Sequence, residues 1–280
     1  MDKSFENSWR LVLLTMLIVL AGSFIGLIPI LDRHEYLWMA VSECALAIPI
    51  LIGVRMLKGT PGFGSALFKG FSPALVPILV LIPFCMQNFI LYITLPLEGL
   101  LYELFGSDAS AVVKADSVRA LAVQIFSICL VPAVMEEFLC RGVIMRLLKP
   151  YGTAVAVMVS ALTFSMLHFS MTSFVVIFML GVLMAAVKIM TGSIWACVLI
   201  HFSNNLAAMI SEQLAIGDFA AQIVEITAAV LFPVLVFGMF KLLKPEMPIE
   251  PKRKKTGFSV SMVLCIMFFF MMIAAGLIMK

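Results

Sequence analysis

Charged residues are scarce in this chain of 280 residues: Asp, Glu, Lys and Arg make up 12% of it, whereas 63% of the residues are hydrophobic. A water-soluble domain is about 25% charged and about 45–50% apolar. This composition excludes an ordinary soluble core, and a net charge of only +3 gives no reason to expect a nucleic-acid partner. We find no stretch that would form a soluble domain and therefore expect a single membrane domain over residues 1–280.

Several familiar signatures are also missing. The six cysteines contain no C-x-x-C pair, so we interpret them as small buried apolar residues and not as a disulfide framework or a thiolate metal site. The zinc-protease signature H-E-x-x-H is absent, and so is the serine-nucleophile signature G-x-S-x-G. No internal repeat is found, which counts against transporter folds built from inverted repeats.

Apolar residues instead gather in runs of about 20, the length that a helix needs to cross a bilayer. We therefore predict an all-α fold, a polytopic transmembrane helix bundle with about 8–9 spans. The apolar segments run roughly over residues 10–31, 37–57, 72–95, 117–147, 152–168, 172–190, 193–211, 221–243 and 258–279.

The distribution of basic residues predicts an orientation. With a cytoplasmic N-terminus and nine spans, Lys and Arg concentrate on the inner side, as the positive-inside rule requires. The strongest anchor is the basic run at residues 252–255, and the outer loops carry acidic residues instead. We expect a multi-pass protein of the cell membrane, and the short loops and Met-rich helices suggest a bacterial plasma membrane.

An ionisable group inside a membrane span is costly and therefore indicates function. In the fourth segment Glu137 and Arg141 are four residues apart, so they share one face of a helix and are expected to pair. Glu136 lies about 100° around that helix and has no such partner. A desolvated carboxyl group without a cation holds a proton more readily than one in water, which suits a general base.

Two more polar clusters follow on later segments. Phe164 and His168 are four residues apart, so the phenyl ring can pack beside the imidazole. His201, Asn204 and Asn205 share a helix face and would offer hydrogen-bond donors, which acyl-transfer chemistry needs for a developing oxyanion. Measured along the helices, Glu136 and His201 reach similar depths, but His168 comes out deeper.

These three motifs, Glu-Glu-x-x-x-Arg at 136–141, Phe-x-x-x-His at 164–168 and His-x-x-x-Asn at 201–205, occur in this order on successive segments. The pattern resembles the type II CAAX prenyl endopeptidase family. That family is also called CPBP or Abi, for CAAX proteases and bacteriocin-processing proteins. The resemblance lies in a motif-bearing core of about residues 117–211.

The resemblance implies an intramembrane endopeptidase with a metal-independent glutamate mechanism. By position, Glu136 would activate a water molecule and His168 would help to hold it. His201 and Asn205 would stabilise the oxyanion of the tetrahedral intermediate. The substrate would be a peptide or a membrane protein, met within the bilayer.

Four further residues would support the site. Glu137 and Arg141 would brace it, although a purely structural ion pair explains them equally well. Phe164 would orient its neighbouring histidine, and Asn204 is interpreted as a packing residue. Other polar residues within the spans are expected to act as contacts between helices or to reach toward the bilayer surface: Glu43, Gln87, Asn88 and Glu225.

Three alternatives stay open. Glu136, His168 and His201 are a conceivable zinc set, since three protein ligands and a water make a catalytic site, but we expect no cofactor. The protein could instead be a non-catalytic immunity or scaffold protein of the same family. A proton-coupled transporter would also use membrane Glu and His residues, but it fits poorly with three polar clusters on adjacent helices.

Overall fold

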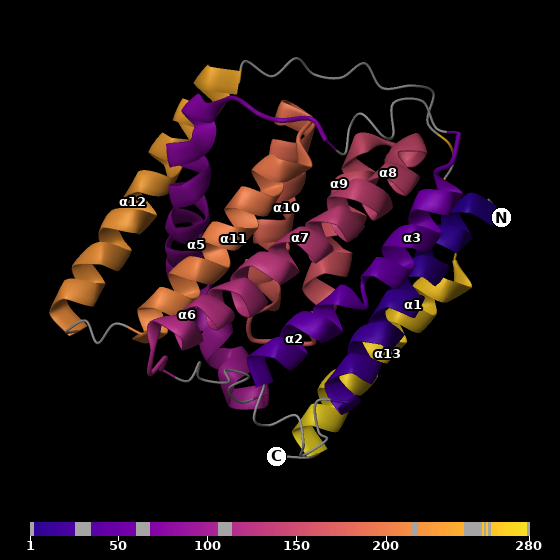
Figure 1. Ribbon diagram of the computed structural model, residues 1–280, viewed down its shortest axis with the longest axis horizontal. Helices are drawn as coiled ribbons and strands as arrows, with labels where there is room; N and C mark the ends of the chain where they lie inside the picture. The colour runs from indigo at the N-terminus through magenta and orange to yellow at the C-terminus, as the bar shows by residue number, and fades with distance from the viewer. Residues whose placement is uncertain are drawn as a thin grey trace.

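The computed structural model describes residues 3–25, 35–59, 68–105, 114–213, 218–243, 254, 256 and 259–278. Within these residues the chain is helical and contains no strand, which confirms the predicted all-α class. The helices lie side by side as a bundle (Figure 1). Each predicted apolar segment corresponds to a helix or to a series of consecutive helices.

Seven helical stretches of the described chain are long and apolar enough to cross a membrane, and two shorter apolar helices lie at 153–166 and 260–275. The protein is therefore a multi-pass membrane protein, whereas the number of spans and the cytoplasmic N-terminus stay predictions. Most of the basic run at 252–255 lies outside the described residues. Many large apolar side chains are exposed along α5 (Val76–Phe105), α12 (Asp218–Leu243) and α13 (Val260–Ile278), as expected for surfaces in contact with lipid.

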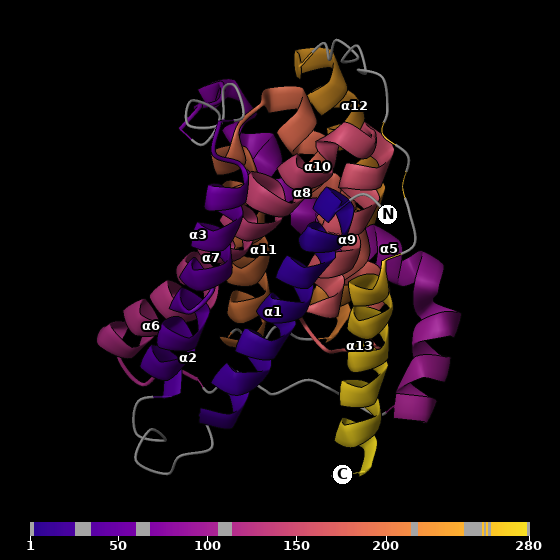
Figure 2. The same ribbon diagram turned by 90° about the vertical axis from the view of Figure 1, so that its right-hand side faces the viewer.

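The first and last helices pack together on one side of the bundle (Figures 1 and 2). These are α1 (Lys3–Ile25) and α13 (Val260–Ile278). The buried carboxylate of Glu6 accepts hydrogen bonds from the backbone N–H and the hydroxyl of Ser261. A buried polar contact of this kind fixes the position of α13 along α1, because an unpaired carboxylate would be costly there.

The second span is broken into α2 (Glu35–Cys44) and α3 (Ala47–Met56) by a turn at residues 45–46. α2 packs against α7 (Val131–Glu137), and α3 packs against η4 (Phe138–Ile144), the segment that follows α7. Gly53 permits this second contact, because a Cβ atom there would overlap the side chain of Val143.

The central helical stretch is not a regular α-helix. It contains two π-helical segments, η3 (Ile125–Leu130) and η4 (Phe138–Ile144), one on each side of α7 (Val131–Glu137). A π-helical turn changes the register of the side chains around the axis and is frequent at functional sites. The rest of this stretch consists of α6 (Val118–Gln124), α8 (Met145–Leu148) and the 3-10 turn η5 (Lys149–Tyr151).

Three helices complete the core: α9 (Thr153–Met166), α10 (Phe174–Thr191) and α11 (Ile194–Gln213). α9 is short, and the chain turns at residues 167–173 before α10 runs back along it. α9 and α10 approach closely at Gly181, where an added Cβ would lie 3.0 Å from the Cα of Ala161.

Two long helices form the opposite side of the bundle from α1 and α13 (Figure 1). They are α5 (Val76–Phe105) and α12 (Asp218–Leu243), which pack against each other. α5 also contacts α11, so this pair lies next to the core helices that carry the polar motifs.

The close approach at Gly181 yields a stability prediction. Gly181→Val should lower the free energy of unfolding by about 1–3 kcal/mol, because the side chain must push α9 away from α10. The measurement is the unfolding of the purified protein in detergent. The control is Gly99→Ala on α5, where nothing lies within 4 Å of an added Cβ. Equal stability of the two variants would contradict the close contact.

Candidate active site

A buried carboxylate on α7 joins the first and third motifs. Glu137 Oε1 accepts a hydrogen bond from Arg141 Nη1 at 2.7 Å, and it lies 3.2 Å from Nδ1 of His201 on α11. Neither Glu137 nor Arg141 exposes any of its side chain, and His201 is only 2% exposed. The ion pair expected between positions 137 and 141 is thus confirmed, and it extends to a histidine 64 residues further along the chain.

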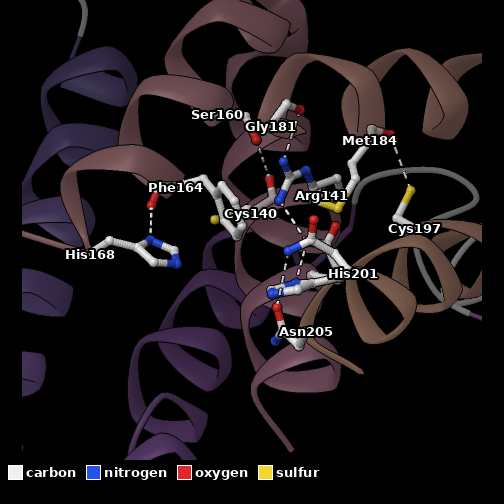
Figure 3. A network of polar contacts seen from close by, with 12 residues as sticks. Cys140, Arg141, Ser160, Phe164, His168, Gly181, Met184, Cys197, His201 and Asn205 are labelled. Atoms are coloured by element: carbon white, nitrogen blue, oxygen red, sulfur yellow. Dashed lines mark hydrogen bonds and ion pairs between the residues drawn. The ribbon is translucent and has the colours of Figure 1, made fainter. Parts of the chain in front are cut away.

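Arg141 connects this carboxylate to two other helices. Its Nη2 donates a hydrogen bond of 2.9 Å to the carbonyl oxygen of Gly181 on α10. Its guanidinium carbon lies 4.7 Å from the ring centroid of Phe164 on α9, in a cation–π contact. Figure 3 shows Arg141 among these groups. Burying one guanidinium therefore fixes the relative positions of α7, α9 and α10, because each contact offsets part of its desolvation.

Phe164 lies between the two histidines. Its ring centroid is 5.0 Å from that of His168 and 5.3 Å from that of His201, both in edge-to-face geometry. His168 follows the end of α9, and its Nδ1 lies 2.8 Å from the carbonyl oxygen of Phe164. The structure thus brings the second and third motifs together around one aromatic ring, which the residue count along the helices did not predict.

The partners of the histidines determine what each ring can do. A carbonyl oxygen only accepts, so Nδ1 of His168 must carry the proton, and Nε2 of the neutral ring is then an acceptor. A carboxylate also only accepts, so Nδ1 of His201 must likewise carry a proton. Nε2 of His201 becomes a donor only when the ring is doubly protonated, and Glu137 is then its counter-ion.

The two asparagines follow His201 on α11. Asn205 Nδ2 donates a hydrogen bond of 3.2 Å to the carbonyl oxygen of Ile128, in the π-helical segment η3. Asn204 Nδ2 donates to Asn205 Oδ1 at 3.3 Å. An amide nitrogen carries two hydrogens, so the Asn205 side chain is anchored by one and retains the second.

Glu136 differs from its neighbour. It is 9% exposed, and its Oε2 atom has no hydrogen-bond partner among the described residues. The structure records Glu137, and not Glu136, in direct contact with His201. Glu43 on α2 lies close enough to Glu136 for the two carboxyl groups to interact, and its Oε2 atom is likewise buried without a hydrogen-bond partner among the described residues.

A cavity of about 1130 Å³ adjoins the histidines. His168, His201, Asn204 and Asn205 line it, together with apolar side chains of α5, α10 and α12. Glu136 is not among the described residues of its wall. The volume exceeds the usual range of about 300–1,000 Å³ for small-molecule pockets, so the cavity has room for a longer ligand such as a peptide segment.

A comparison with known protein families finds a match for the segment that carries these residues. Residues 118–207 match the family model described as type II CAAX prenyl endopeptidase Rce1-like. This segment is similar to the Rce1-like family. No curated protein and no solved structure gives a significant match. The Rce1-like segment extends from α6 into α11 and contains all three motifs.

The Rce1-like family is a family of membrane proteases, so the match supports a protease that acts on a peptide or protein substrate in the membrane. All eight residues singled out in the motifs lie within the matched segment. The resemblance inferred from the motifs is thereby confirmed for this part of the chain. Their individual catalytic roles stay predictions.

The zinc alternative can be examined through ligand geometry. Within the described part of the chain, no three side chains of His, Cys, Asp or Glu are grouped so that they could hold a metal ion. A catalytic zinc needs three protein ligands about 2.0–2.3 Å from one point.

Sequence reasoning missed two features of the site. Glu43 was interpreted as a contact between helices, whereas it lies beside Glu136 and shares its lack of a hydrogen-bond partner. The available signal was an acid in an apolar span with no basic residue three or four positions away. Gln87, Asn88 and Glu225 were interpreted in the same way, whereas all three line the cavity.

The buried ion pair yields a second stability prediction. Glu137→Gln should lower the free energy of unfolding by roughly 3 kcal/mol, because it leaves the guanidinium of Arg141 buried without a carboxylate. Replacing both residues, as Glu137→Leu with Arg141→Met, should cost less, because no charge is left unpaired.

Unfolding of the purified variants in detergent measures both effects. The matched control is Glu136→Gln, one position earlier, which removes a carboxylate that has no ion pair among the described residues. If Glu137→Gln and Glu136→Gln destabilise the protein equally, the ion pair does not hold the site together.

Proposed function

We propose that this protein is an intramembrane endopeptidase of the CAAX-protease type, in which Glu136 activates a water molecule for attack on a peptide carbonyl. The catalytic core is assigned to residues 117–211, because Glu136, His168, His201 and Asn205 all lie there. The family match to a membrane protease supports this assignment.

The main support for this proposal is that the adjacent carboxylates of Glu136 and Glu137 have different surroundings. Glu137 is engaged by Arg141 and His201, so its carboxylate is held in place and its negative charge is compensated. Glu136 has no ion pair among the described residues and retains a buried oxygen without a partner. Pairs of carboxyl groups with different surroundings commonly divide catalytic roles in this way.

The two histidines would have different roles in this mechanism. Nε2 of His168 is a hydrogen-bond acceptor in the neutral ring, which suits it to hold one hydrogen of the attacking water. Nε2 of His201 donates when the ring is positively charged, and the carboxylate of Glu137 stabilises that charge. His201 and the remaining N–H of Asn205 would donate to the oxyanion as negative charge develops on it.

The reaction is balanced without a further reagent. The water oxygen bonds to the carbonyl carbon while one water proton passes to Glu136, and the carbonyl electrons move onto the oxyanion. When the tetrahedral intermediate collapses, the carbon–nitrogen bond breaks and Glu136 returns the proton to the leaving amine. Glu136 is thus regenerated in its starting form.

A comparison of cleaved peptides tests this proposal. The purified protein, reconstituted in liposomes, is incubated with a proteome-derived peptide library, with and without S-farnesylated cysteine, and new peptide termini are identified by mass spectrometry. Glu136→Gln should reduce cleavage by at least about 10²-fold, the usual contribution of general acid–base catalysis. Glu103→Gln, an exposed site on α5, is the matched control. Undiminished cleavage by Glu136→Gln would refute the glutamate mechanism, and no cleavage by the unaltered protein would favour a non-catalytic scaffold or immunity protein.

Metal independence is part of the proposal. Cleavage of the same library should persist after treatment with EDTA or 1,10-phenanthroline. Loss of cleavage on chelation, with recovery on adding zinc, would exclude the metal-free mechanism.

A further inference from the structure

One of the described residues that line the cavity is acidic, Glu225 on α12. Ala221, Val224 and Glu225 of α12 all line the cavity, and their spacing of three and four places them on one helix face. The carboxylate of Glu225 is therefore presented to the same space as His168 and His201.

Nothing in the described structure neutralises this charge. Glu225 is half-buried and makes no hydrogen bond or ion pair with another described residue. The described residues that line the cavity include no Lys, no Arg and no other Asp or Glu. Most of them are apolar, so the cavity combines an apolar surface with one uncompensated negative charge.

A half-buried carboxylate without a cation depends on water for its solvation. A bound peptide displaces part of that water, and the desolvated carboxylate then costs free energy unless a cation meets it. An apolar or acidic side chain at that point leaves the cost uncompensated, whereas the ammonium of Lys or the guanidinium of Arg offsets it. Discrimination between substrates follows from this difference.

We propose that Glu225 is a specificity-determining residue, and that the cavity selects peptide substrates with a Lys or Arg side chain seated against α12. The proposal rests on the proposed endopeptidase function. Glu225 is fixed on a helix, and the cleaved bond must lie at the histidines. The basic residue therefore occupies one defined position relative to that bond, on one side of it.

The experiment uses the full-length protein in liposomes and the same peptide library. The frequency of each residue type is scored at every position around the bonds that are cleaved in a Glu136-dependent manner. The unaltered protein should enrich Lys and Arg about fivefold at one position, the effect expected for one partly exposed ion pair.

Three variants locate the source of the preference. Glu225→Gln should abolish the enrichment, and Glu225→Lys should replace it with enrichment of Asp and Glu at the same position. Glu103→Gln removes an exposed acidic residue of α5 outside the cavity wall and should leave the enrichment unchanged. If Glu225→Lys does not fold, the comparison of Glu225→Gln with Glu103→Gln still decides the question.

The outcomes separate the two proposals. Glu136-dependent cleavage without enrichment, with enrichment scattered over many positions, or with enrichment that survives Glu225→Gln would overturn the specificity role and leave the protease function standing. A complete lack of Glu136-dependent cleavage would overturn the protease function, and this inference with it.

Discussion

Burying a guanidinium inside a helix bundle is tolerable only when several groups compensate its charge, and Arg141 meets this condition through three different helices. A carboxylate on α7, a carbonyl oxygen on α10 and an aromatic ring on α9 surround it. Each partner must be placed within a few ångströms, so the one buried charge constrains the packing of its neighbours. The carboxylate of Glu137 also contacts His201 on α11, so the packing around Arg141 is coupled to the position of a candidate catalytic group.

The two π-helical segments of the central helical stretch carry groups of this site. η4 begins directly after Glu137 and contains Arg141, and η3 contains the carbonyl oxygen that anchors Asn205. The extra residue in each π-helical turn rotates the side chains that follow it. The close approach of α9 to α10 at Gly181 then brings the Gly181 carbonyl within reach of the guanidinium.

Much of this could be predicted from the sequence, for physical reasons. Apolar runs separated by polar turns located the helices, since a backbone in lipid must satisfy its own hydrogen bonds. The spacing of Glu137 and Arg141 predicted their pairing, because residues four apart share a helix face even across a modest change in helical register. The three motifs pointed to the family that residues 118–207 match.

Contacts between helices could not be predicted in this way. The count along straight helices separated His168 from His201, whereas His168 lies in the turn after α9 and both imidazoles contact the ring of Phe164. The contact of Glu137 with His201, the proximity of Glu43 to Glu136 and the place of Glu225 in the cavity wall each depend on how helices distant in sequence pack. Spacing along one helix carries no information about the neighbour it will meet.

The proposed mechanism requires that Glu137 act on catalysis through His201, the contact that joins the buried ion pair to the catalytic groups. A double-mutant cycle on the rate of peptide cleavage tests it most directly, with Glu137→Gln, His201→Ala and the double variant compared in liposomes. If the carboxylate works by orienting and charging the imidazole, the double variant should be about as slow as the slower single variant, because the two groups act as one unit. Rate losses that multiply independently would contradict this account.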